Sequence, residues 1–190
     1  MSRDRWGIEG PAPEAYSRVT NPDRFRPLHS FAEGLAVQLE ARFDVERTEG
    51  YGLDAELERP GTVRPTIRLT PTGPRTASVV FAFTAFPGVT TRSGRWKVDA
   101  FPACGCDACD EHVEDQMERL AWLVDQVIAG RFREAIVLPV VGAAWARVEI
   151  WSPDGSRQGS ESRLDRTEAR RRLSEAHQAA FGWEAWPPRN

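Results

Sequence analysis

The 190-residue chain lacks any run of about 18 apolar residues, the length needed to cross a membrane. Its first thirty residues also lack the apolar segment of a signal peptide. We therefore expect a cytoplasmic location and no membrane association. The formal net charge is only −3, and the basic residues are dispersed among acidic ones, so nucleic acid is not an expected partner.

Lysine is almost absent, because Lys97 is the only lysine among 25 Lys and Arg residues, an imbalance that we attribute to GC-rich coding. A glycine-rich phosphate-binding loop is absent too. The three histidines, His29, His112 and His177, show no spacing to serine or aspartate that would indicate a catalytic triad. The sequence therefore favours a noncatalytic interaction or regulatory protein, with another protein as the candidate partner.

Cysteine is scarce as well, yet Cys104, Cys106 and Cys109 all lie within six residues. An odd number of thiols in a reducing compartment argues against a disulfide framework. The thiols could share a metal ion, and zinc is the candidate because it takes about four thiolate or imidazole ligands. His112, three residues after Cys109, is the candidate fourth ligand. The alternatives for that fourth position are Asp107, His29 and His177.

Two other interpretations of the cysteine cluster remain open. Cys106 and Cys109 precede a helical pattern, an order that resembles the strand, loop, C-x-x-C and helix of thioredoxin-like oxidoreductases. Acidic neighbours oppose a reactive thiolate there, because they raise thiol pKa values. The simplest interpretation is a structural loop of small, reduced thiols in which Gly105 allows a turn, and it requires no cofactor. Zinc binding and a thiol-dependent enzyme are the alternatives.

Three segments have the hydrophobic period of an amphipathic helix. The first is expected at residues 22–43, with Asn21 as its N-cap. The second follows the cysteines and ends near Gly130, since glycine commonly terminates helices. The third begins at Asp165, whose spacing to Glu168 is that of a capping box.

Strand patterns occur between these helices, and they are separated by short turns rather than by a regular strand, helix, strand alternation. We therefore predict an α+β fold with a mainly antiparallel sheet of about five to six strands and about three packed helices. A single domain is expected over 1–190, with 1–20 as an extended arm and 183–190 as an aromatic, proline-containing tail. The main strand patterns lie at 45–48, 67–69, 77–86, 89–91, 95–101, 134–138 and 145–151.

Several short motifs together resemble a family of unknown function from GC-rich Gram-positive bacteria. The resemblance covers nearly the whole chain, and it implies a single cytoplasmic domain without supplying an activity, a cofactor or a catalytic residue. The motifs are Arg5-Trp6-Gly7, the segment from Pro13 to Pro22, the CGCDACDE run from Cys104 to Glu111, Gly130 to Glu134, Trp151 to Gly155, and Trp186-Pro187-Pro188.

Overall fold

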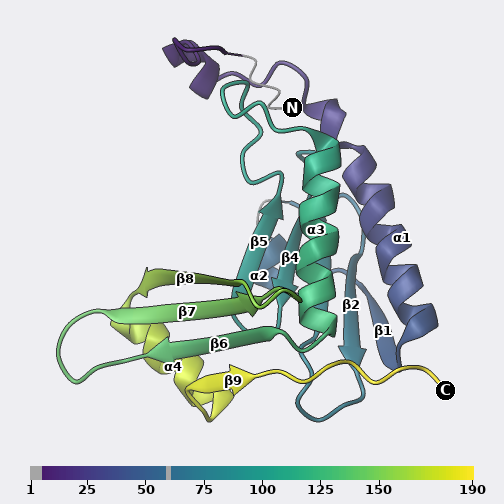
Figure 1. Cartoon of the computed structure of the whole chain (residues 1–190), viewed down its shortest axis with the longest axis vertical. Coiled ribbons are helices and arrows are strands. Elements are labelled where there is room, and N and C mark those ends of the chain that lie inside the picture. Colours follow the sequence, from purple (N-terminus) through teal and green to yellow (C-terminus); the bar gives the residue numbers. More distant parts are fainter. Residues whose placement is uncertain (1–5, 59–60) are drawn as a thin grey trace.

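The computed structural model describes residues 6–58 and 61–190, so the first five residues of the expected N-terminal arm lie outside the described residues. The strands form two antiparallel sheets, of five and four strands, with helices packed on their faces (Figure 1). The predicted α+β class is therefore confirmed. The described residues form nine strands, more than the five to six that we expected. The strands at Arg157–Leu164 and Ala180–Gly182 have no apolar pattern from which they could be predicted.

The first sheet is a meander in which each strand pairs with the next one in sequence. Its central strand, β3 (Val79–Thr84), is buried at every position, as the continuous apolar run in the sequence predicts. Alternate side chains of β3 face two separate hydrophobic clusters, one on each side of the sheet. The other strands are β1 (Val45–Gly50), β2 (Thr66–Pro71), β4 (Gly88–Ser93) and β5 (Lys97–Phe101).

Two helices, α1 (Pro27–Arg42) and α3 (Val113–Ile128), lie side by side over one face of this sheet (Figure 1). Their apolar stripes form the main core with Phe81 and neighbouring strand residues, and Leu120 of α3 is fully buried there. The short helix α2 (Ala55–Glu58) covers the opposite face through Leu57. Helices therefore lie on both faces of the first sheet (Figure 1).

The helix predicted at 22–43 is divided in the structure, which corrects our expectation. Residues Pro22–Phe25 form a 3₁₀ helix, η2, and α1 starts at Pro27. Pro27 has no backbone N–H for a bond to a residue one turn earlier, so it fits the first turn of a new helix and not the middle of a continuous one. The side chain of Asn21 makes no capping hydrogen bond. A second 3₁₀ helix, η1, spans Pro13–Tyr16.

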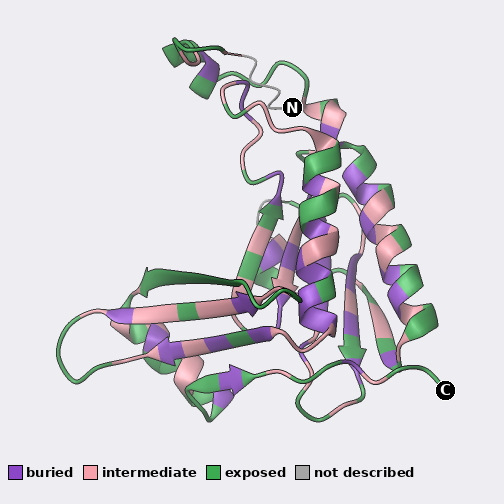
Figure 2. Cartoon of the chain, viewed as in Figure 1, coloured by how far each residue is buried: buried purple, intermediate pink, exposed green. Residues whose placement is uncertain are grey.

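The second sheet has the strand order β8-β7-β6-β9 and is covered by α4 (Arg166–Ala176). The helix begins as the capping box predicts, because the Asp165 side chain accepts hydrogen bonds from the N–H groups of Thr167 and Glu168. The edge strand β8 is almost entirely exposed (Figure 2). The strands are β6 (Phe132–Val137), β7 (Ala144–Trp151), β8 (Arg157–Leu164) and β9 (Ala180–Gly182).

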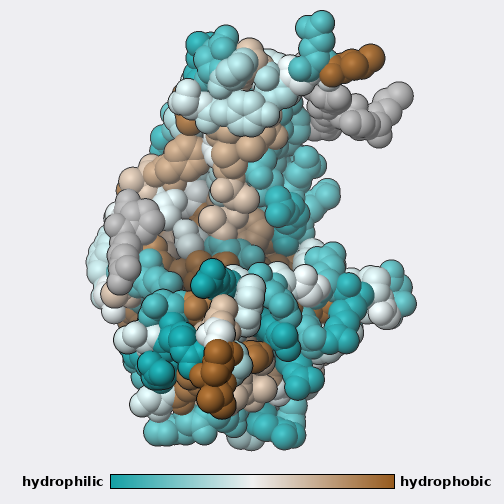
Figure 3. Space-filling view, turned by 90° about the vertical axis from the view of Figure 1, so that its left-hand side faces the viewer, coloured by the Kyte–Doolittle hydropathy of each residue, from teal (hydrophilic) through white to brown (hydrophobic). Residues whose placement is uncertain are grey.

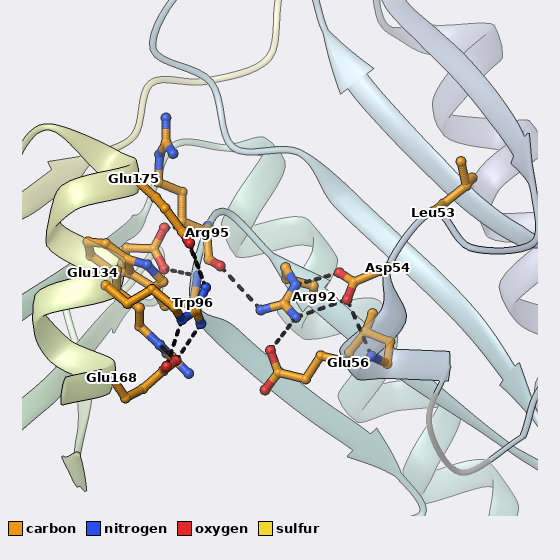
Figure 4. Close-up of polar contacts among 12 residues, drawn as sticks. Leu53, Asp54, Glu56, Arg92, Arg95, Trp96, Glu134, Glu168 and Glu175 are labelled. Atoms are coloured by element: carbon orange, nitrogen blue, oxygen red, sulfur yellow. Dashed lines mark hydrogen bonds and ion pairs between the residues drawn. The ribbon is translucent and has the colours of Figure 1, made fainter. Parts of the chain in front are cut away.

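Glu134 of β6 joins the two sheets at the turn between β4 and β5 (Figure 4). Its carboxylate accepts the backbone N–H groups of Arg95 at 2.7 Å and Trp96 at 2.8 Å, and the indole N–H of Trp183 at 3.2 Å. Glu134 is 1% exposed, and burial raises the pKa of its carboxyl although the N–H donors oppose that change. A buried carboxylate from one sheet therefore holds the backbone of the other.

A second ionic cluster lies beside this joint on the first sheet (Figure 4). The guanidinium of Arg92 donates to both carboxylate oxygens of Asp54, at 2.6 and 3.0 Å, and to Glu56 at 2.8 Å. Burial opposes ionisation of Asp54, yet Arg92 outweighs it and lowers the pKa of that carboxyl. These ion pairs connect β4 to the segment that forms α2, so they stabilise the first sheet and not the contact between sheets.

The C-terminal segment also packs against the first sheet. The indole N–H of Trp186 donates to the carbonyl of Ala77 at 2.8 Å, and Trp186 is only 3% exposed. Its ring meets that of Phe43 edge to face. The aromatic tail therefore forms part of the main hydrophobic core.

Candidate metal centre

The three cysteines lie in the connection between β5 and α3, and this connection is docked against the N-terminal part of the chain. The backbone N–H of Asp107 donates to the carbonyl of Arg18 at 2.8 Å, and that of Ala108 donates to Ala15 at 3.1 Å. The Asp107 carboxylate in turn accepts the backbone N–H of Thr20 at 2.9 Å and the Thr20 hydroxyl. Asp107 thus clamps the cysteine loop to the segment that contains η1 and η2.

Gly105 approaches Phe86 closely. A Cβ atom at this position would lie 2.2 Å from the Phe86 ring, so a side chain here would require that ring to move. The turn that we expected Gly105 to permit is not the reason for a glycine, since its φ is not in the left-handed region. The Phe86 ring itself lies 6.0 Å from that of Phe25 in η2, so the loop is fixed on two sides.

The structure brings the three thiols together. The Sγ atoms of Cys104 and Cys106 are 3.2 Å apart, and those of Cys106 and Cys109 are 3.5 Å apart. All three Sγ atoms lie within 4.8 Å of one another, and all three cysteines are free thiols. Cys106 is buried, Cys104 is half-buried and Cys109 is exposed, so the cluster lies at the surface with its central sulfur covered.

The other predicted ligands do not join this group of three sulfurs. His112 lies just before α3, and its Nε2 atom is buried without a hydrogen-bond partner among the described residues, 3.9 Å from an Asp110 oxygen. His29 is buried in α1 and bonds to the Gly88 carbonyl at 3.0 Å. His177 terminates α4 in a left-handed conformation. Asp107 is engaged by Thr20, as described above.

The sulfurs influence one another's protonation. A hydrogen bond from the Cys104 thiol, helped by the backbone N–H of Cys109, lowers the pKa of Cys106. Hydrogen bonding with Cys104 and Cys106 raises the pKa of Cys109 to about 12. The cluster therefore favours one thiolate at the buried central sulfur and a protonated thiol at the exposed position.

This arrangement fits a tetrahedral metal ion better than thiol–disulfide exchange. Zinc–sulfur bonds of about 2.3 Å in tetrahedral geometry separate the sulfurs by about 3.8 Å, which is about 0.3 Å longer than the Cys106–Cys109 separation and about 0.6 Å longer than the Cys104–Cys106 separation. The Glu111 carboxylate accepts the backbone N–H of Cys104 at 3.0 Å, so a negative charge that favours a cation lies beside the loop. Exchange chemistry instead needs an accessible thiolate, whereas here the accessible thiol is the one with the raised pKa.

Comparison with known proteins places the chain in a family. The sequence profile of a family of unknown function matches residues 3–190. The chain belongs to DUF6226. The predicted membership of a family of unknown function is thereby confirmed, and it covers the cysteine loop and both sheets of this DUF6226 protein. No curated protein and no solved structure matches the chain. Within the described residues, every helix is too short or too polar to span a membrane.

Proposed function

We propose that Cys104, Cys106 and Cys109 form a structural zinc centre in a noncatalytic protein. The observation that carries this proposal is the approach of three reduced sulfurs to within 4.8 Å of one another. A divalent cation would neutralise the thiolates and the surrounding carboxylates, which otherwise repel one another. Reduced thiols of this kind fit a reducing compartment, and we therefore place the protein in the cytoplasm.

His112 is our candidate for the fourth ligand. Its buried Nε2 atom has no hydrogen-bond partner among the described residues, and such atoms are rare unless a ligand or water satisfies them. The Asp110 carboxylate lies 3.9 Å from this same nitrogen, so it would add negative charge beside a cation bound there. Zinc held in this way would fasten the loop that docks η1 and η2 onto the rest of the fold.

The test is the metal content of protein purified without chelator. We expect one zinc ion per chain, and we expect Cys104→Ser, Cys106→Ser and Cys109→Ser each to lose it with a similar, large fall in melting temperature, because metal binding is coupled to folding. Asp107→Asn is the matched control, since it weakens the link to Thr20 without removing a ligand and should keep the zinc. Substitution by Co²⁺ would give thiolate charge-transfer absorption that weakens in each cysteine variant.

The opposite result would support a purely structural thiol loop. In that case the purified protein holds no stoichiometric metal, a chelator leaves the melting temperature unchanged, and the three serine variants lose stability in proportion to the burial of each cysteine. His112→Ala separates the two parts of the zinc proposal. Loss of zinc affinity in this variant supports a histidine ligand, and unchanged affinity shows that the fourth position is filled by another group.

A second observation favours an interaction role for the connection between β6 and β7. Val140 is 96% exposed and Val141 is 87% exposed, and this end of the molecule faces the viewer in Figure 3, where hydrophobic side chains gather in its lower part. Arg166 of α4 fixes the loop by donating to the carbonyls of Pro139 at 2.9 Å, Gly142 at 2.7 Å and Val140. A rigid loop that presents apolar side chains loses little entropy on binding another protein.

Photo-crosslinking in cells tests this second role. A photoreactive amino acid at position 140 should give a discrete adduct with one protein, and the same residue at position 98, where the exposed Val98 of β5 lies, should give none. Arg166→Ala should weaken the adduct, because the loop then loses its three hydrogen bonds. Equal labelling at both positions would contradict a dedicated binding loop.

A further inference from the structure

A cavity of about 520 Å³ lies between β5 and α3, the two elements that flank the cysteine loop in sequence. None of the three cysteines lines it. Its β5 wall carries Lys97, Asp99 and Phe101, which alternate along the strand and therefore share one face. Its α3 wall consists of residues spaced three and four apart, which form one stripe of the helix. These helix residues are Asp115, Glu118, Arg119, Trp122 and Leu123, and the second sheet closes the cavity with Ile150 and Gln158.

The polar face of β5 is turned toward this cavity. Lys97 is the only lysine of the chain, it is 15% exposed, and its Nζ donates to Asp99 Oδ1 at 2.7 Å. On the opposite face of the strand, the apolar Val98 is 41% exposed to solvent. The usual arrangement of an edge strand, apolar inward and polar outward, is therefore reversed here, which places an ion pair inside and a valine outside.

Several polar atoms beside this ion pair have no partner among the described residues. Asp99 Oδ2 is one of them, although the other carboxylate oxygen is bonded to Lys97. The hydroxyls of Thr91 and Ser93 are others, and these residues pair with Asp99 and Lys97 across β4 and β5. Thr91 and Ser93 are fully buried and do not line the cavity, whereas Lys97 and Asp99 do, so this ion pair is the polar contact that the cavity offers to a ligand.

We propose that the cavity binds a free α-amino acid with a large apolar side chain. The ligand's ammonium group would donate to the Asp99 carboxylate, and its own carboxylate would accept from the remaining donors of Lys97. Its side chain would pack against Trp122 and Phe101 and against the aliphatic residues of the lining. The cavity volume is within the range of small-molecule sites, about 300–1,000 Å³.

The lining carries charged groups of both signs, which suits a zwitterion. The two basic residues, Lys97 and Arg119, face three acidic ones, Asp99, Asp115 and Glu118. An apolar carboxylate would leave the Asp99 carboxylate with Lys97 as its donor, and an apolar amine would leave the Lys97 ammonium without a second acceptor. Only a ligand with both groups satisfies the pair, so specificity should depend on both charges together.

Calorimetry with L-phenylalanine as the probe tests the proposal on the full chain. We expect saturable binding of one molecule per chain, with 3-phenylpropionate and phenethylamine each about tenfold weaker because one charge-assisted contact is lost. Glycine, which lacks the apolar side chain, should bind more weakly still. Absence of saturable L-phenylalanine binding, or equal binding of either analogue with a single charge, would overturn the proposal.

Variants of the ion pair provide the second test. Lys97→Gln and Asp99→Asn should each weaken L-phenylalanine binding by about tenfold, while Val98→Ala, on the opposite face of the same strand, should leave it unchanged. If either variant unfolds, NMR titration of the unaltered protein with L-phenylalanine tests the proposal instead. Amide shifts induced by L-phenylalanine should fall on β5 and α3, and shifts confined to other elements would show that the amino acid binds elsewhere.

Discussion

The two sheets differ in how far their strands are removed from water. In the first sheet β3 is buried at all six positions, whereas in the second sheet β8 is exposed at seven of its eight positions. Burial of apolar surface contributes about 25 cal/mol per Å², so the free energy of unfolding is concentrated in the first sheet. The second sheet has a helix on one face only and depends on its joint with the first sheet for much of its stability.

The largest expected effect comes from the core of the first sheet. Leu120→Ala should lower the free energy of unfolding by about 2–5 kcal/mol, because it removes a fully buried side chain and leaves a cavity. Leu173→Ala in α4 is the matched control and should cost less, since Leu173 is only half-buried. Urea unfolding followed by circular dichroism measures both changes.

The same experiment tests our proposal of a single domain. Phe132 and Ile150 of the second sheet belong to the core that contains Leu120, so both sheets should unfold in one transition. Separate transitions for the two sheets, with Leu120→Ala moving only one of them, would contradict this expectation.

The joint between the sheets should give the next largest effect. Glu134→Gln places an amide NH₂ where a carboxylate oxygen now accepts an N–H, and we expect a loss of about 1–3 kcal/mol from the unpaired donors. Thermal unfolding of both proteins measures the loss. Comparable stability of the variant would show that the sheets do not depend on this carboxylate.

The pH dependence of that difference has a defined sign. Burial raises the pKa of Glu134 in the folded protein, so the contribution of the protonated carboxyl is fully present below the unfolded pKa and is lost as pH rises through the raised folded pKa. The advantage of the unaltered protein over Glu134→Gln should therefore shrink as pH increases from acidic values toward neutrality. A stability advantage that grows over this pH range would refute a raised pKa for Glu134 in the folded protein.

The smallest effect is expected at the start of α4. Asp165→Ala removes the acceptor for two helix N–H groups, so the amides of the first turn should exchange faster with solvent while those of β3 keep their protection. The pKa of Asp165 is lowered by the N–H groups of Thr167 and Glu168, so this capping is present above the unfolded pKa and is lost as pH falls through the folded one. Hydrogen exchange followed by mass spectrometry resolves the two regions.

Local patterns in the sequence predicted much of the first sheet and the two later helices. The continuous apolar run of β3, the stripe of α3 and the capping spacing at Asp165 each depend on neighbouring residues alone. The division into two sheets was not predictable in this way. The polar β8 and the three-residue β9 have no hydrophobic pattern, and β-sheet pairing with β7 and β6 defines them.

In the candidate metal centre, too, the sequence predicted the contacts between neighbouring residues and not those between distant ones. Clustering of the cysteines in sequence predicted that their sulfurs would meet, and the structure brings all three together. The docking of the loop was not expected, because 87 residues separate Thr20 from Asp107. The inward-facing ion pair of β5 was missed for a related reason, since an alternating strand does not reveal which of its faces a distant helix will cover.

The turn held by Glu134 has a consequence for synthesis of the chain. Arg95 emerges from the ribosome 39 residues before Glu134, and β1 to β5 pair only with their sequence neighbours, so the meander can form early. Until β6 follows, however, the turn amides remain bonded to water, and the Trp96 ring lacks its contact with Phe181 until β9 follows as well. We expect a nascent chain that stops before β6 to expose this turn as a recognition site for chaperones.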